Sequence, residues 1–411
     1  MITCDSPGLA PVDQALESLL NFVQPKPGSA TIALADADGR VLAEDIHSSL
    51  NVPPADNSAM DGYAVRAADL AAGDTLKLAG KSMAGHPFIG QMKAGECIRI
   101  MTGAVMPDGA DTVVMQENTE VAGEGLIRFP HPAEQGDNVR LCGEDIRSGQ
   151  QILASGRRLR PADLGLLASI GIAQVSVKPR IKVALMATGD ELVAPGQPLA
   201  TGQIYQSNSF TVGTMLRRLG CEVVDFGIVE DSASALRAAF EQADSAADVV
   251  MTTGGVSVGE ADYTKDVLES LGRIDFWRLA IKPGKPFACG HLPNSLFIGL
   301  PGNPVSAMVT MHQLATPMLR RLAGEQQVMA QRLTARAAEV LRKRPGRTDF
   351  QRGICSYDSD GQLQVRAAGN QSSAVLSSLS QANCYIVLEQ QRGRVESGET
   401  VTVELFDGLL L

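Results

Sequence analysis

The segment from Thr252 to Lys265 combines glycines, hydroxyl residues and carboxylates in the manner of an anion-binding loop. It reads TTGGVSVGEADYTK and continues an apolar run, DVVMTT, that predicts a buried strand. Glycines leave backbone N–H groups open to a ligand, and hydroxyl groups add further donors. Asp262 could hold a cation on a phosphate bound there. A loop that is Gly-rich by chance is the alternative, but the position at a strand end favours binding.

Within this run, residues 255–259 read GVSVG and match the G-x-S-x-G pattern of a hydrolase nucleophile. That pattern requires a helix directly after the serine. Helical spacing begins only near Thr264, and neither His291 nor His312 has a supporting context as the base. The hydrolase interpretation is therefore weak.

Two adjacent carboxylates, Asp190 and Glu191, follow a second predicted strand, IKVALMAT at 181–188. At a strand end they could hold Mg²⁺, or an oxyanion through Mg²⁺. Helix N-caps and turns use the same residue types, so both interpretations stay open.

Two further segments are typical of anion sites. Lys282 and Lys285 flank a Pro-Gly turn in IKPGKPF, and the stiff proline lets both ammonium groups bind with little loss of entropy. Next, GLPGNPVS at 299–306 opens a predicted helix whose free N–H groups attract anions. A basic surface turn is the alternative for the first segment.

Three polar segments are weaker signals when each is taken alone. Taken alone, DNSAMDGYA at 56–64 is more typical of a plain turn than of a loop with exposed carboxylates, and RLCGEDI at 140–146, with Arg140, Glu144 and Asp145, is a weak signal. RKRPGR at 342–347 is more typical of a solvated basic turn than of a ligand site.

Charge and cysteine content exclude several classes of function. The chain has 411 residues and a formal net charge of −10, which disfavours non-specific binding to nucleic acid or to an anionic membrane. No apolar run is long enough to predict a transmembrane helix. The seven cysteines are scattered, which predicts reduced thiols in a cytoplasm and disfavours zinc, copper or iron–sulfur sites. A required metal should be a hard cation such as Mg²⁺.

The segments between these motifs predict a multi-domain α/β protein. Residues 178–326 alternate apolar strands with helices, which predicts a parallel sheet covered on both faces, with ligands at the carboxyl ends of its strands. Short β-like runs at regular spacing predict β-rich units elsewhere. The expected domains are an α/β domain from 9–26 and 178–326, a mixed linking domain from 27–47 and 147–177, an inserted mostly-β domain at 48–146, and a C-terminal β domain at 328–411.

Seven segments occur in one order and resemble the molybdopterin molybdenumtransferases, the bacterial counterparts of the E domain of gephyrin. They are DNSAMDGYAV, RIMTGA, GEDI, ATGDEL, TTGGVSVGEADYTK, AIKPGKPF and GLPGNPVSA. The resemblance implies a cytoplasmic, Mg²⁺-dependent enzyme that takes adenylylated molybdopterin and molybdate, hydrolyses the adenylate, and releases AMP and molybdenum cofactor.

The resemblance also implies a homodimer, an adenylyltransferase partner and a set of site residues. Its cleft would lie between the α/β domain of one subunit and the inserted β domain of the other, and a molybdopterin adenylyltransferase is the expected supplier of substrate. The implied catalytic residues are Asp61, Asp145, Glu191, Asp231 and Asp262, with Glu191 and Asp262 as the metal ligands. The implied substrate-binding residues are Thr102, Arg140, Ser257, Lys282, Lys285, Pro301, Asn303 and Arg352.

Two other functions stay open from the sequence. A non-catalytic molybdopterin-binding or scaffold protein of the same architecture would show the same motifs. A molybdopterin adenylyltransferase would share the α/β domain, although the four-domain layout argues against it. An adenylyltransferase consumes ATP, whereas the transferase releases AMP and requires molybdate.

Overall fold

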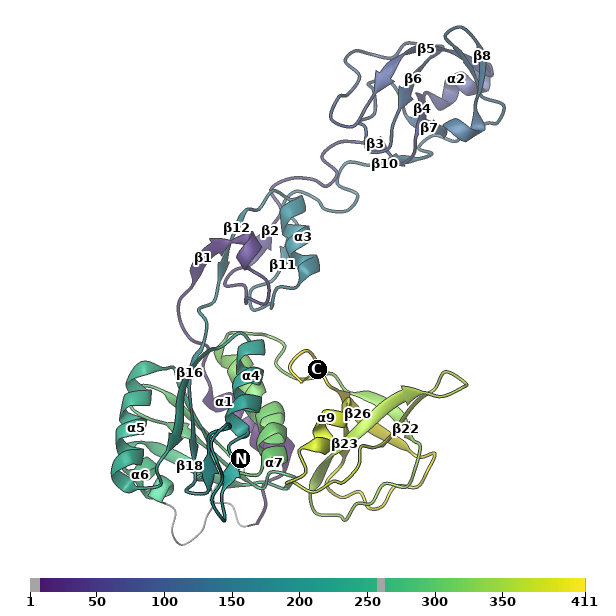
Figure 1. Cartoon of the computed structure of the whole chain (residues 1–411). Helices are drawn as coiled ribbons and strands as arrows, with labels where there is room; N and C mark the ends of the chain where they lie inside the picture. Colours follow the sequence, from purple (N-terminus) through teal and green to yellow (C-terminus); the bar gives the residue numbers. More distant parts are fainter. Residues whose placement is uncertain (1–7, 257–262, 411) are drawn as a thin grey trace.

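The computed structural model describes residues 8–256 and 263–410. The molecule is elongated (Figure 1). An α/β domain and a C-terminal β domain lie side by side at one end, a small linking unit follows, and an inserted β domain stands at the far end. This is the expected fold class, a multi-domain α/β protein with β-rich additions.

A six-stranded sheet forms the centre of the α/β domain. Its order is β16 (Glu222–Val229), β13 (Lys182–Thr188), β17 (Val249–Thr253), β21 (Leu296–Leu300), β20 (Pro286–His291) and β18 (Arg273–Arg278). The first four strands are parallel, as expected, but β20 and β18 run antiparallel to their neighbours. The sequence analysis missed this edge hairpin, because the two strands are joined by the long KPGKP segment rather than by a short turn.

Helices cover both faces of this sheet because its strands are apolar on both sides. Along β13, Val183 and Leu185 belong to one core while Ala184 and Met186 belong to the other, which is the alternation of a strand. The first core is covered by α1 (Val12–Phe22), α4 (Asn208–Arg218), α7 (Pro304–Thr310), a π-helical turn (Met311–Ala315) and α8 (Thr316–Leu322). The second is covered by α5 (Ala233–Ala246) and α6 (Tyr263–Leu271).

The linking unit is built from two separate stretches of chain. Strand β1 (Ala30–Ala33) pairs with β12 (Gln174–Val177), and β2 (Ile46–His47) pairs with β11 (Gln151–Leu153). Helix α3 (Pro161–Ser169) packs on these pairs through a shared apolar core. The chain therefore leaves this unit after β2 and returns at β11, so everything between is an insertion.

The inserted domain is a six-stranded sheet with apolar cores on both faces. Its order is β7 (Thr112–Met115), β4 (Gly62–Val65), β6 (Glu96–Ile100), β5 (Thr75–Ser82), β9 (Leu126–Arg128) and β8 (Glu120–Gly123). Its one α-helix among the described residues is α2 (Ala67–Ala72). A two-stranded ribbon of β3 (Asn57–Ser58) and β10 (Val139–Arg140) lies at its base.

The C-terminal sheet contains one strand that comes from the middle of the chain. Its order is β19 (Ile281–Lys282), β23 (Thr348–Tyr357), β24 (Leu363–Ala367), β22 (Leu333–Ala337), β26 (Thr400–Leu405) and β25 (Cys384–Leu388). Strand β19 belongs to the segment that carries the two lysines of the KPGKP turn. The C-terminal domain is thus joined by backbone hydrogen bonds to that turn.

A buried polar cluster also joins the α/β domain to the C-terminal domain. His312 of the π-helical turn lies 3.2 Å from the Glu404 carboxylate, and both side chains are almost fully buried. Arg332 lies 3.2 Å from the other oxygen of Glu404. Burial opposes charge on the imidazole, but hydrogen bonds to Asp407 and Glu404 outweigh it and raise the pKa of His312. The same contacts lower the pKa of Glu404 despite its burial and bring the pKa of Asp407 to about 2.

Within the described ranges, no helix is both long and apolar enough to cross a bilayer.

The His312 cluster predicts a pH-dependent contribution to stability. A histidine with a raised pKa stabilises the fold fully below its ordinary value of 6.5 and loses that effect as the pH rises through the folded value. Glu404, with its lowered pKa, stabilises above 4.5 and loses that effect as the pH falls. Replacing His312 by Gln should therefore lower the thermal unfolding midpoint most near pH 5.5, by roughly 6 °C, because it breaks a buried ion pair.

The difference in unfolding midpoint between the wild type and His312→Gln should become smaller toward pH 9. His131→Gln, at an exposed histidine of the inserted domain, is the matched control and should change the midpoint at neither pH. An equal loss for His312→Gln at both pH values would show that the imidazole is not charged in the folded protein.

Candidate functional site

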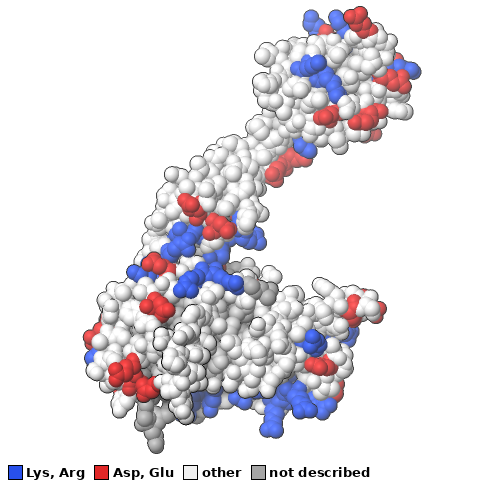
Figure 2. Space-filling view, in the orientation of Figure 1, with Lys and Arg blue, Asp and Glu red and all other residues white. Residues whose placement is uncertain are grey.

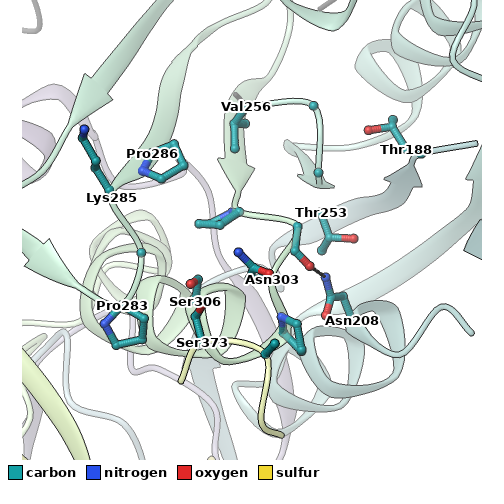
Figure 3. Close-up of a pocket in the computed structure, with 18 of the residues that line it drawn as sticks. Thr188, Asn208, Thr253, Val256, Pro283, Lys285, Pro286, Asn303, Ser306 and Ser373 are labelled. Atoms are coloured by element: carbon teal, nitrogen blue, oxygen red, sulfur yellow. Dashed lines mark hydrogen bonds between the residues drawn. The ribbon is translucent and has the colours of Figure 1, made fainter. Parts of the chain in front are cut away.

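A pocket of about 1130 Å³ lies where the parallel strands of the α/β domain end. Its lining includes Thr188 at the end of β13, Thr253 at the end of β17, Pro301 directly after β21, and Asp231 shortly after β16. All four carboxyl ends meet at one edge of the sheet because the strands are parallel. Loops far apart in the sequence therefore converge on one volume (Figure 3).

The loop after β17 lies close to the neighbouring strand, and two glycines make this possible. Gly254 and Gly255 have φ angles of +100° and +65°, which residues with a side chain rarely adopt. A Cβ atom on Gly254 would lie 2.6 Å from the carbonyl oxygen of Thr188, and one on Gly255 would lie 2.6 Å from Oγ1 of Thr264. Larger residues at these positions would push the loop out of the pocket wall.

Two polar atoms of the pocket wall are buried without a partner among the described residues. They are Oγ1 of Thr253, which is 2% exposed, and Oδ1 of Asn208. The amide nitrogen of Asn208 donates to the carbonyl oxygen of Gly302 at 2.7 Å, which fixes its orientation toward the loop after β21 (Figure 3). Buried polar atoms are usually paired, so these two indicate a site for a polar ligand.

One side of the pocket is cationic. Lys282, Lys285 and Arg347 line it, together with the hydroxyl residues Ser306 and Ser373. Lys285 has no carboxylate within ion-pair distance in the described parts of the chain, so its ammonium group is open to a ligand. Figure 2 shows Lys and Arg side chains gathered along the lower edge of the C-terminal domain. This side suits phosphate groups or an oxyanion.

The other side of the pocket is acidic. Glu191 and Asp231 both line it. Burial raises the pKa of Asp231, and the negative charges of Asp190 and Glu191 raise it further. Carboxylates that repel one another in a pocket fit a divalent cation, which prefers oxygen ligands. The described residues hold no group of three or more metal-ligating side chains already in position. Any Mg²⁺ there would complete its coordination with substrate oxygens or water.

The structure brings six of the implied site residues into this one pocket. They are Glu191, Asp231, Lys282, Lys285, Pro301 and Asn303. Ser257 and Asp262, the other two implied residues of the α/β domain, lie outside the described residues.

Four implied site residues lie in or beside the inserted domain and do not line the pocket. Asp61 and Thr102 are in direct contact, since the Asp61 carboxylate accepts from the backbone N–H of Thr102 at 2.7 Å and from its hydroxyl at 2.8 Å. These two hydrogen bonds, with a smaller effect of Arg99, lower the pKa of Asp61. Arg140, on β10, and Asp145 are both exposed.

Arg352 differs from what its implied role requires. Its side chain is fully buried, whereas a substrate-binding side chain must reach the pocket. The guanidinium donates to Oγ of Ser378 and to the carbonyl oxygens of Asn370 and Ser372. Arg352 therefore fixes the loop that carries the pocket residues Ser372 and Ser373, rather than lining the pocket itself.

Several pocket residues were missed by the sequence analysis. Arg347 lies in the basic turn that was expected to be solvated. Asn208, at the start of α4, lies in none of the segments singled out above, and Ser372 and Ser373 carry no sequence signal. Each comes from a segment far from the recognised motifs, and only the fold brings them together.

Models of one protein family match most of the chain. They are described as the MoeA N-terminal region (domain I and II) over residues 10–171, a probable molybdopterin binding domain over 184–321, and the MoeA C-terminal region (domain IV) over 334–406. These ranges together cover the linking, inserted, α/β and C-terminal units.

Individual proteins resemble the chain over nearly its whole length. A molybdopterin molybdenumtransferase of Haemophilus influenzae is 48% identical over 97% of this chain and 99% of its own length. A gephyrin of Dictyostelium discoideum is 31% identical over 96% of this chain and 62% of its own length. A crystal structure of a molybdopterin biosynthesis moeA protein from Pyrococcus horikoshii OT3 matches 97% of this chain and all of its own, with a TM-score of 0.83 and 28% identity.

The open ammonium group of Lys285 predicts a loss of anion affinity on its removal. Lys285→Met should weaken the binding of pyrophosphate to the pocket roughly 10–100-fold, because a hydrogen bond to a charged group contributes about 1.5–3 kcal/mol. Isothermal titration calorimetry at low ionic strength measures the dissociation constant. Lys77→Met is the matched control, since Lys77 is an exposed residue of β5 in the inserted domain and does not line the pocket. Equal binding by the two variants would contradict the assignment of an anion site at this turn.

Proposed function

The chain belongs to the molybdopterin molybdenumtransferase family, and from this premise we propose that it inserts molybdate into adenylylated molybdopterin with the help of Mg²⁺. It is a transferase of molybdenum cofactor biosynthesis. In the proposed reaction the adenylate is hydrolysed, and AMP and molybdenum cofactor leave. The observation that supports this most is one pocket with cations on one side and carboxylates on the other.

The cationic side fits the anionic parts of the two substrates. Molybdate is a dianion and the link between pterin and adenosine is a pyrophosphate, so both need ammonium, guanidinium and N–H donors. Lys282, Lys285 and Arg347 supply charge there, and the loop after β21 supplies N–H groups at the start of a helix. A volume of about 1130 Å³ has room for a nucleotide-linked ligand together with an oxyanion.

The acidic side fits Mg²⁺. Glu191 and Asp231 would hold the ion, with Asp262 as the further candidate implied by the family. When bound, Mg²⁺ would neutralise charge on the pyrophosphate oxygens. The protein's own part is to hold both carboxylates on one wall of the pocket, facing the volume where the phosphate groups lie.

The proposed active enzyme is a homodimer. Asp61 and Thr102 hold one another at the far end of this elongated chain, away from the pocket. A second copy that places its inserted domain over this pocket would bring them to the substrate. A molybdopterin adenylyltransferase is the proposed supplier of the adenylylated substrate.

The direct test is AMP release from adenylylated molybdopterin by the purified protein, with and without molybdate and Mg²⁺. The product is then added to a cofactor-free molybdoenzyme. Release that requires molybdate, together with activation of the molybdoenzyme, is the expected result. Binding of the substrate without release would favour the non-catalytic scaffold, and consumption of ATP would favour the adenylyltransferase.

The raised pKa of Asp231 predicts a pH-dependent need for Mg²⁺. Below that pKa the carboxyl group holds a proton, which competes with the metal, so the half-saturating Mg²⁺ concentration should rise as the pH falls. Asp231→Asn should raise this concentration at pH 8 by about tenfold or more and flatten its dependence on pH. Initial rates of AMP release between pH 5.5 and pH 8 measure both effects.

Glu230→Gln is the control for Asp231→Asn. Glu230 is the adjacent exposed carboxylate and does not line the pocket, so its Mg²⁺ dependence should equal that of the wild type. An unchanged Mg²⁺ dependence in Asp231→Asn would exclude this carboxylate from the metal site.

Mixed dimers test the shared active site. Asp61→Asn and Glu191→Gln should each be inactive alone, because each removes one half of every site. Coexpressed and randomly paired, they should recover about a quarter of wild-type activity, since half of the dimers hold one intact site of two. No recovery, despite mixed dimers detected by two affinity tags, would place both residues in the site of a single chain.

A further inference from the structure

We propose that Lys343 and Asp349 of the C-terminal domain are positioning residues that set the two pocket cations Arg347 and Lys282 for the reaction. The inference rests on the proposed function and extends it, because neither residue lines the pocket. Both are buried, at 8% and 3% exposure. They flank Arg347 in the chain, at the start of β23.

Lys343 joins two loops through backbone carbonyl groups. Its ammonium group donates to the carbonyl oxygens of Arg344 and Arg347 at 3.3 and 2.9 Å, within its own turn. It also donates to those of Gln390 and Arg392 at 3.3 and 3.0 Å, in the loop between β25 and β26. One of its acceptors is thus the peptide group of the pocket residue itself. Burial lowers the pKa of Lys343, and the positive charges of Lys282 and Arg347 add to this effect.

The choice of lysine at this position is informative. Between residues 327 and 411 the chain has nine arginines but only one lysine, Lys343. Four carbonyl oxygens around one point suit a compact ammonium group, whereas a planar guanidinium spreads its donors over a wider fork. The requirement is therefore for this geometry and not only for a positive charge.

The same turn is fixed at both ends by backbone hydrogen bonds. The N–H of Gly346 donates to the carbonyl oxygen of Gln390 at 2.8 Å, and that of Thr348 donates to Ala280 at 2.7 Å. Arg347 lies between these two residues, so its backbone is held on each side. Only its side chain is left to extend into the pocket.

Asp349 holds the other pocket cation, Lys282, in the KPGKP turn. Its carboxylate lies 3.2 Å from Nζ of Lys282 and accepts from Nε2 of Gln351 at 3.1 Å. Gln351 also donates to the carbonyl oxygen of Arg342 at 2.9 Å, which connects this carboxylate to the turn that holds Lys343. Since Lys282 and Asp349 are also partners in the β19–β23 pairing, one frame orients both pocket cations.

The test is a pair of double-mutant cycles, read as KM and kcat for molybdate-dependent AMP release. Arg347→Ala first identifies which substrate's KM depends on this cation. Lys343→Met should raise that same KM about tenfold, with a smaller change in kcat, and should have no further effect in the Arg347→Ala background. Lys343→Arg should be as defective as Lys343→Met, because it keeps the charge but not the geometry. Asp349→Asn should likewise lose its effect in the Lys282→Met background.

Controls separate positioning from folding and from the proposed function itself. Arg344→Ala, in the same turn but outside the pocket lining, should behave as the wild type, and thermal unfolding identifies variants that fail to fold. If Lys343→Met fails to fold, the cycle of Asp349→Asn with Lys282→Met still tests whether the buried residues position the pocket cations. If the wild type releases no AMP, the proposed function fails. The same double-mutant cycles are then read from the dissociation constants of molybdate and of pyrophosphate, measured by calorimetry. Full activity of Lys343→Arg, additive effects in both cycles, or an Arg347→Ala variant equal to wild type would overturn the inference.

Discussion

The pocket depends on one constraint, that parallel strands all end at the same edge of the sheet. Because β16, β13, β17 and β21 are parallel, the loops that follow them meet, although they are separated by tens of residues in the chain. A loop can approach its neighbour closely only where no Cβ intervenes, which explains the positive φ angles of Gly254 and Gly255 against Thr188. Carboxylates and donors from segments far apart in the sequence then face one volume.

The sequence predicts well those parts of the fold that local chemistry determines. The apolar runs at 181–188 and 248–253 contain β13 and β17, which are short, lie before glycines and are buried on both faces, as is typical of parallel strands. The sequence does not predict those strands whose pairing depends on contacts between distant segments of the chain. The antiparallel strands β18 and β20 pair across the intervening KPGKP segment rather than a short turn, and β19 pairs with a strand more than sixty residues away. Arg347 and Arg352 have the same residue type, yet one lines the pocket and the other is buried beneath its loop. Only their tertiary surroundings distinguish them.

The elongated shape separates Asp61 and Thr102 from the pocket of the α/β domain, although the family resemblance implies that both belong to one site. Asp61 with Thr102 lies on a domain that reaches the rest of its own chain only through the linking unit. Two hydrogen bonds from Thr102 hold the half-buried Asp61 carboxylate there in one orientation. Fixing the orientation of a side chain costs conformational entropy. A carboxylate that is already oriented can bind a ligand or a partner at that face without a further entropy cost. The symmetric pairing proposed above supplies such a partner without further residues.

The C-terminal domain has a larger part in the pocket than its motifs indicate. It contributes Arg347, Ser372 and Ser373 to the lining. It meets the α/β domain through the buried pair of His312 and Glu404, and through Lys282, whose exposed ammonium group contacts the buried Asp349. An apolar interface of the same area would be as stable but would tolerate small shifts, whereas a buried ion pair is lost when its partners move apart. The polar interface therefore fixes the position of one domain against the other. In a pocket whose cations come from both domains, that fixed position is what keeps their charges directed at the same substrate.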